Sequence, residues 1–237
     1  MTNVAIMRAI FSSLDSLPSN NYTPFNRLNK FLWGELVTRT TGVDERRTQI
    51  IAATIRVLAR DGIAGTTTRK IAAEAEVNQA TLRYYFGSKD DLLFAVLQEM
   101  MNMTREIVQT GIATGGELRE VIAESIKAFW AHVEEAPELQ VMQYELTLYA
   151  LRNPESAWLA KKQYDGYSAL VETLLQQHFA LAGKICAIPF AELARFVIGG
   201  LDGLILQFIS DRDIARARRD LDHLIRAVIA LAEEHTA

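Results

Sequence analysis

Helical periodicity runs through almost the whole chain from Asp44 onward, and no other sequence feature constrains the fold as strongly. The segment RRTQIIAATIRVLARDG places Ile51, Ile55 and Leu58 on one face of a helix, and Gly62 is a natural stop. Similar apolar repeats continue to the C-terminus, and no stretch of the sequence shows a convincing strand-like alternation. The sequence therefore predicts an all-α fold.

Residues 1–43 differ from the rest of the chain. They are rich in Asn, Ser and Thr, contain two prolines and show no sustained period. We expect this N-terminal extension to be poorly ordered. One hypothesis is that translation starts later, at Met7 or at Val43, and the intact mass of the native protein tests it.

The net charge of −4 conceals an asymmetry along the chain. Residues 1–43 carry a net charge of +2, residues 44–89 carry +3, and residues 90–237 carry −9. A basic N-terminal third on an acidic body indicates an anionic partner for that third, although charges also scatter by chance.

Composition and motifs exclude several classes of protein. The single cysteine, Cys186, cannot form an intrachain disulfide and fits a reducing compartment. Uninterrupted apolar runs fall short of the roughly 18 residues that span a bilayer, and the N-terminus lacks a signal-peptide pattern. We therefore expect a soluble, cytoplasmic protein. Without a P-loop, nucleophile elbow, zinc motif or dinucleotide-binding glycine pattern, we expect no enzyme, metal or cofactor.

Three short helices are predicted at about 45–60, 67–75 and 79–85. Asn78 is a plausible N-cap of the third helix, one of three threonines caps the second, and Ser88 with Asp91 forms a capping-box-like start of the next helix. The second and third helices are joined by roughly three residues. This spacing is the helix-turn-helix layout, in which the second helix of the pair can enter a DNA major groove.

The third helix separates its apolar and polar side chains. Leu82 and Phe86 lie four residues apart and face the core of the small domain, together with Ile71 and Val77. The outward residues are Gln79, Ala80, Thr81, Arg83 and Tyr84. A glutamine can bind adenine, a threonine methyl can touch thymine, and arginine and tyrosine reach phosphates or, for arginine, guanine. Phosphate contacts are also expected from side chains at neighbouring helix starts: Thr67, Thr68, Arg69 and Lys89.

The stretch GIAGTTTRKIAAEAEVNQATLRYYFGSKDDLLFAVL resembles the DNA-binding domain of TetR-type (tetracycline-repressor-like) transcriptional regulators. The likeness covers about 60 residues from Asp44, and the helix-turn-helix falls on Thr67 to Phe86. The resemblance implies DNA contacts at Thr67, Thr68, Arg69, Gln79, Ala80, Thr81, Arg83, Tyr84, Tyr85 and Lys89.

Two positions depart from the family pattern. Glu76 stands where the family usually has glycine in the tight turn, and a left-handed backbone there costs a non-glycine residue roughly 1–2 kcal/mol. Arg83 stands where the family often has tyrosine, which can change the base preference. Both departures affect operator rules carried over from the family rather than the class of protein.

The resemblance also implies a domain order: an extension at 1–43, a DNA-binding domain at 44–104, and a helical effector-binding and dimerisation domain at 105–237. The last two helices would pair with their copies in a four-helix bundle. Candidate interface residues are Phe196, Gly199, Gly200, Gly203, Leu204 and Phe208. The alternative is that these helices merely pack within one chain.

The middle helices could hold a small-molecule effector. Candidate ligand-binding residues are Trp130, Met142, Glu145, Tyr149, Trp158 and Tyr164. For each aromatic residue the alternative is ordinary core packing. Glu145 is expected to be exposed, or else to pair with a cationic effector.

Taken together, the sequence predicts a ligand-responsive repressor. It would bind a pseudo-palindromic operator on double-stranded DNA as a homodimer, and an effector would release it. The alternative is a helical small-molecule-binding protein without sequence-specific DNA binding. Steep salt dependence of DNA binding would distinguish the two.

Overall fold

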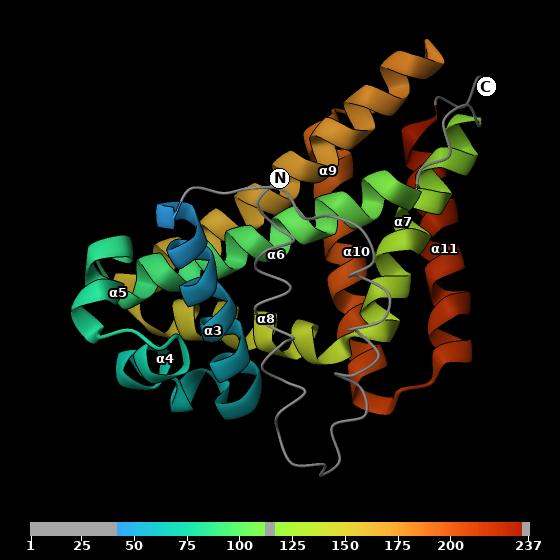
Figure 1. Cartoon of the computed structure of the whole chain (residues 1–237). Helices are drawn as coiled ribbons and strands as arrows, with labels where there is room; N and C mark the ends of the chain where they lie inside the picture. The colour runs from blue at the N-terminus through green and yellow to red at the C-terminus, as the bar shows by residue number, and fades with distance from the viewer. Residues whose placement is uncertain (1–41, 112–116, 234–237) are drawn as a thin grey trace. The chain divides into compact units, whose positions relative to one another are not determined.

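The computed structural model describes residues 42–111 and 117–233, and within these ranges every regular element is helical. The predicted all-α fold is therefore confirmed for the described residues. Residues 1–41 of the predicted extension lie outside them. The elements are α3 (Gly42–Gly65), α4 (Thr68–Glu74), α5 (Gln79–Phe86), α6 (Lys89–Gly111), α7 (Leu118–Glu135), α8 (Pro137–Arg152), the 3₁₀ helix η1 (Pro154–Ser156), α9 (Ala157–Ala182), α10 (Phe190–Asp211) and α11 (Ile214–Ala232) (Figure 1).

The chain forms two compact units. The first unit contains residues up to Met100 together with Glu138–Ala160, and the second contains Met101–Pro137 and Lys161–Ala237. The predicted domain order placed all of residues 105–237 in one C-terminal domain, whereas in the structure Glu138–Ala160 belongs to the first compact unit. The sequence does not reveal this, because the contacts of α8 reach residues far away along the chain.

The helices of the first unit bury their apolar faces. In α3, Ile51, Ile55 and Leu58 are at most 6% exposed, as the periodicity predicted. Ile71 of α4 is completely buried. The start of α6 adds further buried apolar side chains at Leu92, Leu93, Val96 and Leu97. Burial of this kind stabilises the first unit, because each helix removes one apolar face from water.

Local capping defines where these helices begin. The Asn78 side chain accepts a hydrogen bond from the Thr81 amide at 2.8 Å, and Thr67 accepts one from the Lys70 amide at 3.2 Å. Ser88 and Asp91 bond reciprocally, with each backbone N–H donating to the other side chain at 3.2 and 3.0 Å. Because each bond satisfies an N–H that the helix leaves unpaired, these caps set the helix starts. The predicted caps are confirmed.

The turn between α4 and α5 has the predicted left-handed residue. Glu76 has φ of 52°, and the Val77 amide donates to the carbonyl of Ala72 at 2.9 Å to close the turn. A non-glycine residue in this region carries a conformational cost of roughly 1–2 kcal/mol. The turn nevertheless joins the two helices through the three residues Ala75 to Val77 and the cap residue Asn78.

The second unit contains α7, α10 and α11, which pack on one another. In Figure 1, α10 and α11 lie side by side, and α7 contacts α11. The rings of Trp130 on α7 and Phe208 on α10 lie 5.8 Å apart. A Cβ added at Gly200 would come within 2.4 Å of Leu224, so this glycine lets α10 approach α11 closely. The core of the second unit is thus apolar.

One helix among the described residues, α10, is long and apolar enough to cross a membrane by length and composition alone. The longest unbroken apolar runs of the sequence did not indicate a membrane span, because Arg195 and Asp202 break the apolar run of α10. A third of its most apolar stretch is buried inside the structure. The core helix of a water-soluble protein passes the same test, so the feature is weak support for a membrane span.

Candidate nucleic-acid interface

The helix α5 exposes the polar residues that the sequence placed on its outer face. Leu82 and Phe86 are 5% and 8% exposed, whereas Tyr84 is 82% exposed. Of the remaining outward residues, Gln79, Ala80 and Arg83 are exposed and Thr81 is half-buried. The predicted separation of inward and outward side chains is confirmed, and α5 presents a polar, aromatic and basic surface to solvent.

The outward side chains are not equally free to contact a partner. The Thr81 hydroxyl donates to Asn78 at 3.0 Å, which leaves its methyl group for an apolar contact. The Tyr85 ring is half-buried and lies edge-on to Tyr84, with centroids 5.2 Å apart. Because Tyr85 supports its neighbour, Tyr84 and Arg83 are the residues that extend furthest into solvent from the middle of α5.

The start of α4 carries a second set of exposed or half-buried polar side chains. Thr67 caps the helix with its side-chain oxygen, Thr68 is half-buried, and Arg69 is exposed. The first amides of a helix and an exposed guanidinium both suit a phosphate. This end of α4 therefore has the chemistry that a phosphate contact requires.

Lys89 occupies a different environment from the one the sequence suggested. Its ammonium donates to the Thr66 carbonyl at 2.7 Å and lies 5.6 Å from the centroid of the Tyr149 ring. Burial lowers the pKa of Lys89 below its ordinary value. The residue therefore supports the segment that leads into α4, and only its remaining N–H groups could reach a phosphate.

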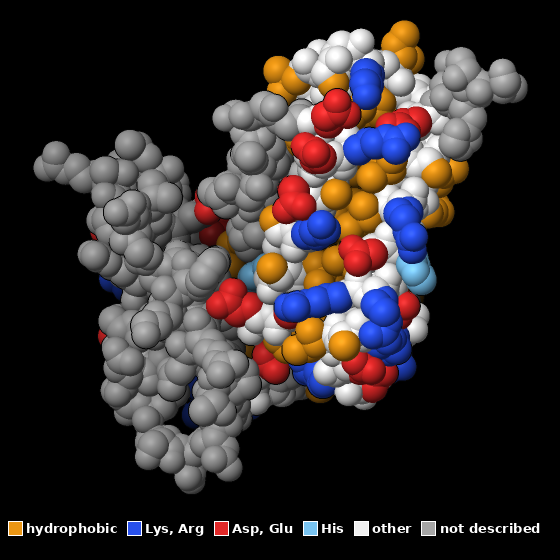
Figure 2. All heavy atoms as spheres, turned by 90° about the vertical axis from the view of Figure 1, so that its right-hand side faces the viewer, with side chains coloured by type: hydrophobic (Ala, Val, Ile, Leu, Met, Phe, Trp, Pro, Cys, Tyr) orange, Lys and Arg blue, Asp and Glu red, His pale blue; other side chains and the backbone are white. Residues whose placement is uncertain are grey.

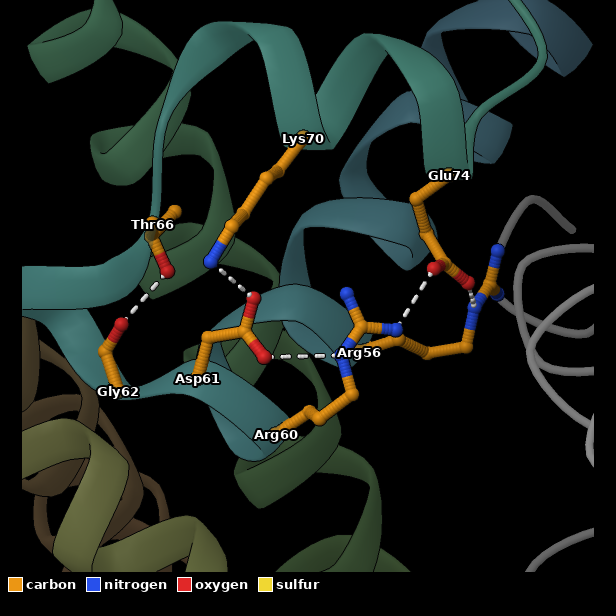
Figure 3. A network of polar contacts seen from close by, with 7 residues as sticks. All are labelled: Arg56, Arg60, Asp61, Gly62, Thr66, Lys70 and Glu74. Carbon is orange, nitrogen blue, oxygen red and sulfur yellow. Dashed lines mark hydrogen bonds and ion pairs between the residues drawn. The ribbon is translucent and has the colours of Figure 1, made fainter.

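Several basic residues of the first unit are engaged in ion pairs (Figure 3). Arg56 and Arg60 of α3 both bond the Glu74 carboxylate of α4, at 2.7 and 3.0 Å. Asp61 accepts from Arg60 at 2.9 Å and from Lys70 at 2.8 Å, and these two hydrogen bonds lower its pKa to about 2. The network ties α4 to α3. The basic surplus of residues 44–89 is therefore not wholly available to an anionic partner.

A depression of about 440 Å³ lies beside the turn of the helix-turn-helix. Its lining residues are Arg46, Ala72, Ala73, Glu76, Val77, Asn78 and Thr81. The sequence prediction missed Arg46, which brings a cation from the start of α3 to the same edge as Thr81. The Arg46-Arg47 pair was the available signal, but sequence spacing does not show that the start of α3 meets the turn.

The predicted ligand-binding residues are divided between the two units. Four of them belong to the first unit, namely Met142, Glu145, Tyr149 and Trp158. Met142 is buried, Trp158 packs edge-on against Phe94 at 5.4 Å, and the Tyr149 hydroxyl donates to Asp90 at 3.3 Å. Glu145 is half-buried and accepts from the Ile63 amide at 3.1 Å, so the expectation that it is exposed is wrong.

The other two predicted ligand residues lie in the second unit. The Trp130 indole donates to Glu134 at 2.8 Å and is almost completely buried. The Tyr164 hydroxyl donates to Asp202 at 3.0 Å, and burial, with Asp202 nearby, raises the pKa of Tyr164 to about 12. In α7, His132 is buried, which lowers its pKa to about 4. Among the described residues, no group of three or more His, Cys, Asp or Glu is arranged to hold a metal ion.

The predicted dimer residues divide between the surface and the core of the second unit. Phe196 is 41% exposed, and a Cβ added at Gly199 or Gly203 would meet nothing within 4 Å. Phe208 is only 2% exposed, so the structure places it in the core and not on a free surface. Gly200 likewise packs within the chain. The exposed part of the set is Phe196, Gly199 and Gly203, with Leu204 half-buried beside it.

The geometry defines a helix-turn-helix DNA-binding protein that carries a second helical unit. Family models agree with this class: "Bacterial regulatory proteins, tetR family" matches residues 50–96, and "Tetracyclin repressor-like, C-terminal domain" matches residues 113–231. The chain belongs to the TetR family of transcriptional regulators. Its helix-turn-helix lies within the first match.

Individual relatives support the same class. The chain is 29% identical over 186 residues to the HTH-type nicotine-responsive transcriptional repressor HdnoR of Paenarthrobacter nicotinovorans, covering 78% of this chain and 94% of the relative. The multidrug binding protein EbrR, solved with imidazole, is 26% identical with a TM-score of 0.56, covering 81% and 97%. Bacillus subtilis FadR, solved with stearoyl-CoA, shares the fold at 20% identity and a TM-score of 0.60, covering 78% and 98%.

Proposed function

We propose that this TetR-family regulator binds a pseudo-palindromic operator as a homodimer and represses transcription until a small molecule releases it. The observation that carries the proposal is the division of α5 into two faces. Its outer face exposes Arg83 and Tyr84, which is 82% exposed, and its inner face buries Leu82 and Phe86. A chain without a DNA partner has no need for such a face. The operator contacts would come from α5 and from the start of α4.

Dimerisation is supported by an apolar stripe on the second unit. On α10 the exposed residues Phe196, Gly199, Gly203 and Leu206 recur at helical spacing. Figure 2 shows the face on which α11 lies, where hydrophobic side chains gather between basic and acidic ones. Such a stripe is costly in water and suits a second copy of the same helices. It also accounts for the high hydropathy of α10.

Effector binding is proposed for the second unit, which contains most of the match to the C-terminal family model. Its polar groups within apolar surroundings include His132 and Tyr164. HdnoR is nicotine-responsive, EbrR is a multidrug binding protein and FadR was solved with stearoyl-CoA, so the relatives differ in ligand chemistry. An effector that prefers a form with altered spacing between two recognition helices would shift the population away from DNA. We propose a cytoplasmic location, where the operator lies.

The decisive experiment is selection of bound fragments from the genomic DNA of the source organism with the full chain. A recovered short pseudo-palindrome, with affinity that falls steeply as salt rises, is the expected result. A chain that circular dichroism shows to be helical, but that retains no DNA at low salt, would instead be a ligand-binding protein without DNA recognition.

The dimer is tested separately with Gly203→Asp. Nothing lies within 4 Å of a Cβ at this position, so the monomer should accommodate the new side chain. In a dimer the charge would be desolvated without a partner, and we expect the dimer dissociation constant to rise at least about 100-fold. Analytical ultracentrifugation measures this. Ala180→Asp, which adds the same charge at an exposed position of α9, is the control.

A further inference from the structure

Gly62 interrupts α3 just before the helix-turn-helix begins. Its φ of 65° and ψ of 173° lie in a region that only glycine adopts readily, and they break the helical path between Asp61 and Ile63. A helix broken in this way leaves backbone N–H groups after the break without their usual carbonyl partners. An unpaired N–H in a half-buried position is costly, so an acceptor must be found elsewhere.

Glu145 of α8 supplies that acceptor. Its Oε2 atom accepts from the Ile63 amide at 3.1 Å, across 82 positions of the sequence. A Cβ added at Gly62 would lie 3.3 Å from the same oxygen, so the absence of a side chain at residue 62 lets the carboxylate reach the backbone. The kink and the glutamate therefore fit each other: one exposes the donor, and the other satisfies it with a charge-assisted hydrogen bond.

The same short segment is held at its other end. The Thr66 hydroxyl donates to the Gly62 carbonyl at 2.7 Å, and Lys89 donates to the Thr66 carbonyl at 2.7 Å. The Lys89 ammonium lies over the ring of Tyr149, one turn along α8 from Glu145. Thus α8 contacts the segment directly through Glu145 and indirectly through Tyr149 and Lys89.

A second pair of bonds fixes α8 and η1 against the first turn of α6. Asp90 accepts from the Tyr149 hydroxyl at 3.3 Å and from the Ser156 hydroxyl at 2.5 Å. All of these residues belong to the first unit. The segment Gly62–Thr66 ends directly at Thr67, the N-cap of α4, so its position sets where α4 begins and where the exposed Arg69 points.

We propose that Glu145 is a positioning residue of the operator-binding surface, which holds the Gly62–Thr66 segment and thereby fixes α4 and α5 for DNA. The proposal rests on the function proposed above. It assigns Glu145 to DNA affinity in place of the effector contact that the sequence suggested. Through this bond a displacement of α8 would be felt at the helix-turn-helix without any change in the residues that touch DNA.

The test compares Glu145→Ala with Glu145→Gln on the operator that the wild-type chain selects. The alanine variant should bind about tenfold more weakly, roughly the value of one hydrogen bond to a charged group. The slope of affinity against salt should stay unchanged, because phosphate contacts are not removed. The glutamine variant keeps an acceptor oxygen and should recover most of the affinity. Glu155→Ala, an exposed glutamate of the same unit, is the matched control and should bind like the wild type.

Hydrogen–deuterium exchange of the peptide that covers Gly62–Thr66 provides the second readout. Exchange should be faster in Glu145→Ala than in the wild type and the Glu155→Ala control, with circular dichroism unchanged. Faster exchange with wild-type operator affinity would overturn the proposal, and so would unchanged exchange. A wild-type chain that selects no DNA would refute the proposed function itself, whereas selection by the wild type with full affinity in Glu145→Ala rejects only the role of Glu145.

Discussion

Within each unit of this regulator, an apolar core is combined with polar contacts between helices, and the two units differ in the part of the fold that those polar contacts hold. In the first unit, ion pairs and hydrogen bonds such as Arg56 to Glu74 and Glu145 to Ile63 hold α4 and the segment that leads into it, around an apolar core. In the second unit, Trp130 and Phe208 pack directly, and His132 is buried in neutral form. The polar contact there joins α11 to α7 through Arg218 and Glu134. Directional polar contacts fix orientation, and apolar contacts supply most of the stability. The first unit must present α5 at one angle, so it benefits from directional polar contacts.

The largest expected effect separates two phenylalanines of α10. Phe208→Ala removes a 2%-exposed ring and should lower the free energy of unfolding by about 3–5 kcal/mol. Phe196→Ala removes a 41%-exposed ring and should change the stability of the monomer by less than about 1 kcal/mol. Denaturant unfolding at low protein concentration measures both. Equal losses would contradict the division of α10 into a core face and a surface face.

Acidification should weaken the second unit before the first. Burial lowers the pKa of His132 from 6.5 to about 4, so the unfolded chain binds its proton at a higher pH than the folded chain. The contribution of neutral His132 to the free energy of unfolding is fully present above pH 6.5. It is lost as the pH falls toward 4, by about 3 kcal/mol in all. Burial lowers the pKa of His178 in the same direction. In the first unit Asp61, with a pKa of about 2, keeps its contribution until the pH falls below about 4.

Hydrogen–deuterium exchange at pH 7 and pH 5 distinguishes the units within one chain. Protection in α7 and α10 should fall more than protection in α3 and α4. A His132→Leu variant should lose much of this pH dependence. If α3 and α4 lost protection first, the contrast between the two units in acid would be wrong.

A substitution on the exposed face of α5 should have an intermediate effect, on operator binding. Arg83→Ala should cost about 1–3 kcal/mol of operator-binding free energy, with no loss of stability because the side chain is exposed. A contact to phosphate would weaken binding to every sequence, and a contact to guanine would relax one base position. Electrophoretic mobility shifts on operator variants separate these outcomes. Arg219→Ala, an exposed arginine of α11, is the control, and an Arg83→Ala affinity equal to it would remove Arg83 from the interface.

The smallest effect is expected in the ion-pair network between α3 and α4. Glu74→Gln keeps the size of the side chain but removes the charge that pairs with Arg56 and Arg60. Partly exposed ion pairs contribute little to stability, so the free energy of unfolding should change by about 1 kcal/mol or less. Thermal unfolding at low and high salt checks this. A loss above about 3 kcal/mol would show that the network, and not the apolar core, stabilises the first unit.

Much of the DNA-binding surface could be predicted from the sequence. Leu82 faces inward and Tyr84 outward because helical periodicity is a local property. The caps at Asn78 and Ser88 depend only on residues three positions away. The left-handed turn at Glu76 was expected because the family usually has glycine at this place. These features all arise within a few residues of chain, where sequence spacing determines geometry.

Other roles were decided only by tertiary structure. Glu145 bonds an amide 82 positions earlier, Lys89 supports Thr66, and Phe208 packs on Trp130 although it shares its helix with the exposed Phe196. Periodicity indicates that a helix has an apolar face, but it does not identify the helix that covers that face. The sequence by itself therefore determined the class of protein, through the family resemblance of its motifs, and the inner and outer faces of α5, through local spacing. The tertiary structure decided which charges are paired and which apolar residues remain exposed, because those depend on contacts between distant segments.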